Sequence, residues 1–215
     1  MEASFWHDRW QSNRIAFHLD EANPLLVHYF SHLQQPLGCR VFVPLCGKTR
    51  DIGWLLTQGY RVVGAELVES AIVQLFADLG VEPEVVEHGP LKHFHARDVD
   101  IWVGDVLELT PALLGEVDAV YDRAALVALP EHMRAGYAHQ LMTLAPAVPQ
   151  LLISYVYDQD QVPGPPFSVS DSEVLRHYDA AYQCLALARH DVNGGLRGQV
   201  PAEEVLWLLR PEANI

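Results

Sequence analysis

The chain has 215 residues and a mass of 24.1 kDa, and half of its residues are apolar, which suffices for one domain with a buried core. Its formal net charge of −14 argues against a nucleic-acid partner, because a phosphate backbone is bound by basic surfaces. Its three cysteines match no metal-binding spacing, and no apolar run approaches the roughly 20 residues of a membrane span. With no basic-then-apolar leader, we expect a cytoplasmic protein that acts on a small molecule.

Aromatic residues crowd the start of the chain, where Trp6 and Trp10 lie four positions apart and Phe17 follows. Such large side chains near a terminus must cover something, either the core or a ligand pocket as a lid. Apolar residues at helical spacing then predict an amphipathic helix over residues 22–33.

Two strand-and-turn units follow. An apolar strand from residue 40 stops at Pro44 and turns through Gly47 into a helical pattern, and a second strand over residues 60–66 ends on Glu66. A further helical stripe ends at Gly80. This alternation at short spacing predicts a doubly wound parallel sheet.

Residues 81–98 break the pattern with prolines, glycines and histidines, and they indicate either a loop or a small hairpin insertion. His93 and His95 could share one face of a strand, but no third ligand lies at a useful spacing. A solvated or locally hydrogen-bonded role is therefore favoured over a metal site.

The pattern of apolar residues over the rest of the chain predicts further strands and helices and one long loop. The capping-box pair Ser170 and Glu173 marks the start of its last helix. The loop is Pro-rich and is expected near the functional edge of the sheet. In chain order we expect strands at 101–106 and 118–123, a helix at 131–144, a strand at 150–157, the loop at 161–167, a helix at 170–178, and closing strands at 182–189 and 206–209.

Four successive strand ends carry candidate ligand-binding residues, and in an open α/β sheet such ends line one crevice. They are Leu45 with Gly47, then Glu66, then Asp105 with Val106, then Arg123. An acid after the second strand can accept hydrogen bonds from ribose hydroxyls, and one after the third can meet an adenine amino group. Each alone is as well explained by a solvated terminus or a helix cap, so it is their joint occurrence that indicates an adenosyl ligand.

The first turn has only one glycine, with Pro44 and Leu45 where a dinucleotide site has a Gly-x-Gly-x-x-Gly loop around the pyrophosphate. A ligand without phosphates tolerates this turn better. S-adenosylmethionine is such a ligand, and its sulfonium cation suits an acidic protein with an aromatic cover such as Trp10 or Phe17. Cys46 is interpreted as a packed turn residue.

Four segments together resemble the thiopurine S-methyltransferase family in its bacterial branch, and the resemblance covers most of the chain. The most specific are the Pro-Leu-Cys-Gly-Lys turn and the Asp-Arg-x-Ala-Leu segment. The four are residues 6–18, 43–48, 64–66 and 121–126.

This resemblance implies an α/β Rossmann-like class I S-adenosylmethionine-dependent methyltransferase. Its fold would be a single domain with a mixed, mostly parallel seven-stranded sheet, helices on both faces and an antiparallel last strand. Residues 1–36 would form an aromatic cover, 37–158 the cofactor-binding core, and 159–215 a substrate-side loop with the closing strands. Matching motif positions imply cofactor contacts by Trp10, Leu45, Glu66, Asp105, Val106 and Arg123, with Phe17 facing the methyl acceptor.

The implied reaction is S-methylation of thiopurine-like aromatic thiols and of selenium or tellurium species, the latter linked to tellurite resistance, by a monomer. Arg123 is the candidate catalytic residue, acting on the methionine carboxylate or on an anionic acceptor; its alternative role is a buried salt bridge with Asp122 or Glu66. The remaining functional alternatives are methylation of other small thiols or of halide or chalcogen anions, a nucleotide-binding oxidoreductase, and a non-enzymatic protein that binds the cofactor or sequesters an oxyanion without turnover.

Overall fold

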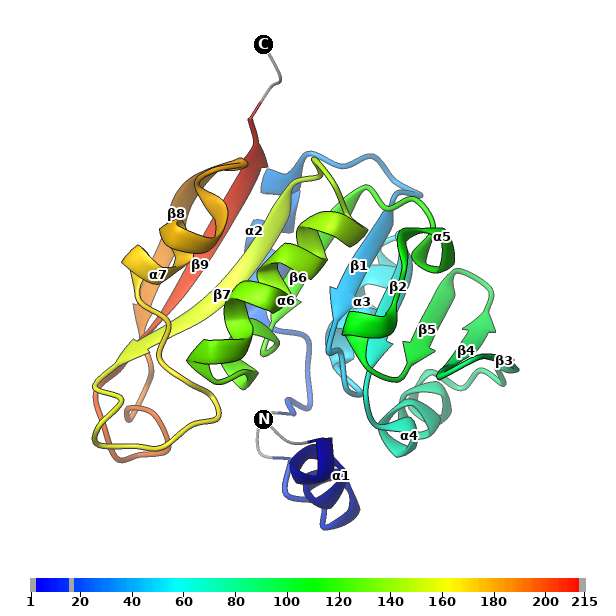
Figure 1. The fold of residues 1–215 in the computed structure, drawn as a ribbon, viewed down its shortest axis with the longest axis horizontal. Coiled ribbons are helices and arrows are strands. Elements are labelled where there is room, and N and C mark those ends of the chain that lie inside the picture. The colour runs from blue at the N-terminus through cyan, green and yellow to red at the C-terminus, as the bar shows by residue number, and fades with distance from the viewer. Residues whose placement is uncertain (1–2, 16–17, 213–215) are drawn as a thin grey trace.

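In residues 3–15 and 18–212, which the computed structural model describes, nine strands form one mixed sheet with helices on both faces (Figure 1). The spatial order of the strands is β3-β4-β5-β2-β1-β6-β7-β9-β8. Their bounds are β1 Arg40–Pro44, β2 Arg61–Glu66, β3 Glu84–His88, β4 Leu91–Ala96, β5 Val99–Val103, β6 Ala119–Arg123, β7 Gln150–Tyr157, β8 Tyr182–Asp191 and β9 Ala202–Pro211.

The centre of the sheet is parallel, since β1 pairs in parallel with β2 and β6, β2 with β5, and β6 with β7. At one side β9 pairs antiparallel with both β7 and β8. The mixed sheet and its antiparallel last strand are therefore confirmed.

The expectation of seven strands is wrong, because residues 84–96 form the hairpin β3–β4, which pairs antiparallel with β5. Of the two interpretations of residues 81–98, the hairpin is correct. Gly89 adopts φ +62° in its turn, which glycine tolerates without strain. All five residues of β3 are exposed, so the strand has no buried face that an apolar alternation could reveal.

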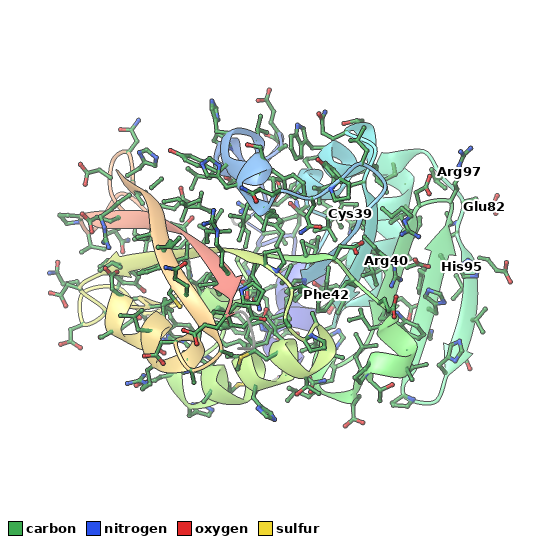
Figure 2. The ribbon with its side chains drawn as sticks, turned by 90° about the horizontal axis from the view of Figure 1, so that it is seen from above. Cys39, Arg40, Phe42, Glu82, His95 and Arg97 are labelled. Carbon is green, nitrogen blue, oxygen red and sulfur yellow. The ribbon has the colours of Figure 1, made fainter. Side chains whose placement is uncertain are left out.

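Helices cover the sheet in two layers, which Figure 2 shows from above with Phe42 between them and His95 at the edge of the sheet. The first layer comprises α2, η1, α3 and α4, and the second α5, α6 and α7. The helical elements are α1 Ala3–Gln11, α2 Pro24–Tyr29, η1 Phe30–Leu33, α3 Arg50–Thr57, α4 Glu69–Leu79, η2 Val106–Glu108, α5 Pro111–Leu114, η3 Leu126–Ala128, α6 Glu131–Leu144 and α7 Asp171–Tyr178.

Side chains of β1 alternate between the two layers, as strand geometry requires. Val41 and Val43 are buried against the first layer, and Phe42 is buried against the second. Because both faces are covered, the central strands are apolar almost throughout, which made them easy to find in the sequence.

The expected helix over residues 22–33 is shorter than predicted. Asn23 caps α2 by accepting a hydrogen bond from Leu25 N at 2.8 Å, and Pro24 occupies its first turn. The last turn tightens into the 3₁₀ segment η1, and Gln34 ends it with φ +54°. No helix in the described part of the chain is both long and apolar enough to span a bilayer.

Candidate active site

The turn after β1 has an unusual backbone. Leu45 has φ +48° and Gly47 has φ +53°, both in the left-handed region, which an L residue such as Leu45 occupies only with strain. A Cβ on Gly47 would lie 3.0 Å from a ring carbon of Trp10. The glycine therefore makes room for the indole of Trp10, which is 6% exposed, to pack on the turn.

Glu66, at the end of β2, is buried and stabilises this turn by hydrogen bonds to its backbone. Its Oε2 accepts a hydrogen bond from Gly47 N at 2.8 Å, and its Oε1 accepts one from Val68 N at 2.9 Å. Burial raises the pKa of this carboxyl, while the backbone donors lower it. Two oxygens offer about four lone-pair sites, so the carboxylate keeps acceptor capacity for a ligand.

Asp105 and Val106 follow β5 at the next strand end. Gly104, with φ +139°, has no room for a side chain, since a Cβ would meet Leu91 Cδ2 at 2.5 Å. Asp105 is exposed and caps η2, its Oδ1 accepting from Leu107 N at 2.9 Å. Asp105 is thus a helix cap, one of the two roles considered for it, and it also lines the cavity described below.

Arg123 ends β6 with a side chain that is 11% exposed. Its Nη1 lies 3.9 Å from Oδ2 of Asp51, a buried residue of α3, and the same oxygen accepts from the Tyr121 hydroxyl at 3.1 Å. Arg123 therefore forms its ion pair with Asp51 and not with Asp122 or Glu66, the partners considered from the sequence. The sequence did not indicate Asp51, because β6 and α3 meet only in the folded chain.

Asp122 turns away from Arg123 into the core. It accepts hydrogen bonds from the Tyr137 hydroxyl at 2.8 Å and from Leu126 N at 3.1 Å. Burial raises its pKa to about 6, against these bonds, which lower it. Asp122 therefore joins β6 to α6 beneath the strand end.

A cavity of about 840 Å³ brings the predicted residues together. In Figure 1, α1 lies on the side of the sheet to which the arrow of β1 points. Trp10 of α1 packs there with Val68 and Ala71. Phe17 lies outside the described residues. The cavity is lined by all six predicted cofactor contacts: Trp10, Leu45, Glu66, Asp105, Val106 and Arg123.

We call the four residues Leu45, Glu66, Asp105 and Arg123 the strand-end wall of this cavity. The same cavity is also lined by Met133 and Tyr137 of α6 and by Pro165 and Pro166 of the Pro-rich loop, which we call the loop wall. The Pro-rich loop was expected near this edge, and Met133 and Tyr137 were expected on the inward face of a helix over residues 131–144, but no sequence signal marked them as cavity residues. The lining residues that were not predicted include Asp51, Tyr155 and Arg197.

The histidines of the hairpin lie elsewhere. His93 stacks on Trp102 with ring centroids 4.3 Å apart and bonds Asp100 at 3.0 Å. Among residues 3–15 and 18–212, no three His, Cys, Asp or Glu side chains are arranged to hold a metal ion. Cys46 is buried, and burial raises its thiol pKa well above the ordinary value, which fits a packed turn residue.

The fold resembles that of solved methyltransferases. The structure of a 1,6-didemethyltoxoflavin-N1-methyltransferase from Burkholderia thailandensis, with bound 1,6-didemethyltoxoflavin and S-adenosylhomocysteine, superposes with a TM-score of 0.68 at 18% identity, over 98% of this chain and 87% of that one. The fold is therefore that of the class I S-adenosylmethionine-dependent methyltransferases.

The sequence comparisons narrow this class. The thiopurine S-methyltransferase family model matches residues 1–206. A thiopurine S-methyltransferase of Xanthobacter autotrophicus is 53% identical over 97% of this chain and 99% of its own length, and one of Teredinibacter turnerae is 47% identical over 100% of both. The chain belongs to the thiopurine S-methyltransferase family. It is an S-adenosylmethionine-dependent methyltransferase, which leaves the oxidoreductase alternative without support.

The residues of the cavity fit this cofactor. Glu66 offers a buried carboxylate with spare acceptor sites, and the turn around Gly47 provides the close backbone approach of an adenosyl site without a pyrophosphate cradle. The volume lies within the range of about 300–1,000 Å³ usual for ligand sites.

Proposed function

We propose that this enzyme transfers a methyl group from S-adenosylmethionine to the sulfur of thiopurine-like aromatic thiols, and to selenium and tellurium species. The observation that carries the proposal is a cavity that combines a mostly polar strand-end wall with a largely apolar loop wall, in a chain 53% identical to a relative named thiopurine S-methyltransferase. The apolar side chains of the loop wall suit a flat, partly apolar acceptor, and the polar groups of the strand-end wall suit the cofactor.

In this proposal the strand-end wall holds the cofactor. Glu66 accepts hydrogen bonds from the ribose hydroxyls, Asp105 and Val106 border the adenine, and Leu45 packs against the cofactor from its turn. Trp10 covers it from α1. Phe17, outside the described residues, would face the acceptor.

When bound, S-adenosylmethionine supplies a methyl group activated by its positively charged sulfur. The chain aligns the acceptor sulfur with that methyl group and excludes water, through the cover of α1 and the loop wall. An aromatic thiol can be anionic near neutral pH, so no strong general base is required.

Arg123 is the proposed catalytic residue. Its guanidinium lines the cavity beside Asp51 and Tyr121, where it can pair with the methionine carboxylate or with an anionic acceptor. A guanidinium has five N–H donors, so the arginine can bind a further anion while it stays beside Asp51.

We further propose that the chain acts as a monomeric single-domain enzyme of the cytoplasm and contributes to tellurite resistance. Other small thiols and halide or chalcogen anions remain alternative acceptors, because the cavity also presents the cations Arg123 and Arg197.

The test is a transfer assay with methyl-labelled S-adenosylmethionine and a panel of a thiopurine, a simple thiophenol, selenite and tellurite. Label is expected first on the sulfur of the aromatic thiols. Consumption of the cofactor with an aliphatic thiol or a halide, and none with aromatic thiols, would overturn the proposed acceptor class.

A further inference from the structure

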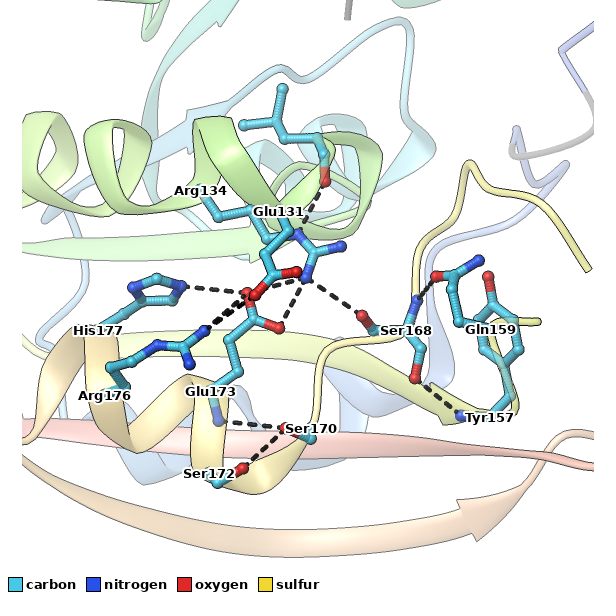
Figure 3. Close-up of polar contacts among 11 residues, drawn as sticks. Glu131, Arg134, Tyr157, Gln159, Ser168, Ser170, Ser172, Glu173, Arg176 and His177 are labelled. Carbon is cyan, nitrogen blue, oxygen red and sulfur yellow. Dashed lines mark hydrogen bonds and ion pairs between the residues drawn. The ribbon is translucent and has the colours of Figure 1, made fainter.

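Arg134 and Glu173 form a buried ion pair, and neither residue lines the cavity. Arg134 of α6 is 3% exposed and Glu173 of α7 is 7% exposed. Nη1 of Arg134 donates to both carboxylate oxygens, at 2.8 Å and 2.7 Å (Figure 3). Burying two charges is expensive unless the geometry is good and further hydrogen bonds satisfy them, so the other contacts of this pair show what it holds.

Arg134 ties three segments together. Its Nε donates to Leu129 O at 2.8 Å, just before α6, and Nη1 also reaches Ser168 O at 3.2 Å in the loop before α7. Its guanidinium carbon lies 5.6 Å from the ring centroid of Phe167 in that same loop. One side chain thus joins the entry of α6, the Pro-rich loop and α7.

The Pro-rich loop is held beside the cavity by contacts of Phe167. Phe167 N donates to Val127 O at 2.6 Å, and the Phe167 ring leaves no room for a side chain at Gly164, where a Cβ would meet it at 2.3 Å. Pro165 and Pro166, next to Phe167, line the cavity. Their placement therefore depends on the contacts that hold Phe167 and Ser168.

The same arginine is fixed to the other part of the loop wall. Met133 and Tyr137 on α6 line the cavity on either side of Arg134 in sequence. An α-helix advances 100° per residue, so Arg134 points toward the loop while its neighbours face the cavity. A shift of the ion pair would move both parts of the wall.

We propose that Arg134 and Glu173 are positioning residues for the methyl acceptor: they hold Pro165, Pro166 and the α6 face at the spacing that a flat aromatic thiol requires. The inference rests on the proposed function, because it concerns the acceptor of that reaction. Neither residue lines the cavity, so both act through the wall.

The main test is the double variant Arg134→Met with Glu173→Leu, because replacing a buried ion pair by apolar residues is often neutral for folding. The measured quantities are the Kd of 6-mercaptopurine, a thiopurine, for the protein saturated with S-adenosylhomocysteine, and the Kd of S-adenosylhomocysteine itself. We expect the thiopurine Kd to rise by about tenfold or more, since small misplacements of binding groups have large effects. The S-adenosylhomocysteine Kd should stay within about twofold.

The matched control is Arg189→Met. Arg189 binds Asp171 of α7 at 2.6 Å and Glu203 at 2.7 Å, so it also holds α7, but it is exposed and does not line the cavity. Its thiopurine Kd should match that of the wild type. The single variant Glu173→Gln keeps a hydrogen-bond acceptor for Arg134 and should show a smaller loss than the double variant.

Two results would overturn the inference: a folded double variant with an unchanged thiopurine Kd, or a parallel rise of both Kd values, which is the mark of a general structural role. Thiopurine binding by the wild type without methyl transfer would instead refute the proposed function and leave this test readable.

Discussion

The strand-end wall and the loop wall enclose one cavity, but different interactions hold them. Glu66 and Gly47 are joined by a carboxylate-to-backbone bond within the sheet and its first turn. The loop wall depends on side chains that meet from distant parts of the chain, above all Arg134 and Glu173, which are 39 positions apart. If the strand-end wall holds the cofactor as proposed, its geometry is fixed by the sheet and its first turn, whereas the proposed acceptor side depends on a few side chains.

The largest expected effect concerns the loop wall. Arg134→Met alone leaves Glu173 buried without its main partner, and breaking such a pair usually costs about 3–5 kcal/mol of folding free energy. Denaturant unfolding should show this loss. The exposed control Arg189→Met should lose no more than about 1 kcal/mol. Equal losses in the two variants would mean that burial does not distinguish the two pairs.

The free energy of unfolding should depend on pH through Asp122, which joins β6 to α6 by its bond to Tyr137. Because burial raises the pKa of Asp122 to about 6, the native state holds its proton between about pH 4 and 6, where the unfolded state releases it. This group therefore contributes a fall in stability as pH rises through that window, by at most about 3 kcal/mol.

The measurement is the unfolding free energy of wild type and Asp122→Asn at pH 4 and pH 7. The advantage of the wild type over the variant should shrink as pH rises, since asparagine does not titrate. An advantage that grows between these pH values would show that the bonds from Tyr137 and Leu126, rather than burial, dominate Asp122.

On the strand-end wall, Glu66→Ala should weaken S-adenosylhomocysteine binding by roughly 1.5–3 kcal/mol, as expected for the loss of charge-assisted hydrogen bonds. The change also frees Gly47 N and Val68 N. Isothermal titration measures the effect, with Glu69→Ala, an exposed neighbour paired with Lys92, as the control. An unchanged affinity in the Glu66 variant would move the ribose contact elsewhere.

The smallest expected effect is at the first turn. Gly47→Ala places a Cβ at φ +53° and 3.0 Å from the Trp10 ring, which should lower stability by about 1–2 kcal/mol and shift Trp fluorescence. Gly53→Ala, inside α3 with an ordinary 3.6 Å contact to Leu79, should instead be neutral or raise stability by up to about 1 kcal/mol. Equal behaviour of the two variants would mean that Trp10 does not pack on the turn as described.

The strand-end wall could be predicted from the sequence, whereas most of the loop wall could not. The ends of β1, β2 and β6 were found because central parallel strands are apolar on both faces and stop at turn residues. Those ends carry Leu45, Glu66 and Arg123, so the strand-end wall could be predicted residue by residue. The exposed strand β3 had no such pattern.

Contacts between distant side chains could not be predicted. Ser170 and Glu173 were expected to form a capping box, and Ser170 Oγ does accept from Glu173 N at 3.3 Å. The carboxylate of Glu173, however, binds Arg134 of another helix. Asp51 likewise meets Arg123 only because α3 packs beside the end of β6.

The most direct test of the account is whether the two walls bind two molecules side by side. A thiopurine should be titrated into the wild-type protein alone and into the protein saturated with S-adenosylhomocysteine. We expect the thiopurine to bind in both cases, with the cofactor product already in place at the strand-end wall. Loss of thiopurine binding on saturation, the sign of competition for one site, would contradict the account.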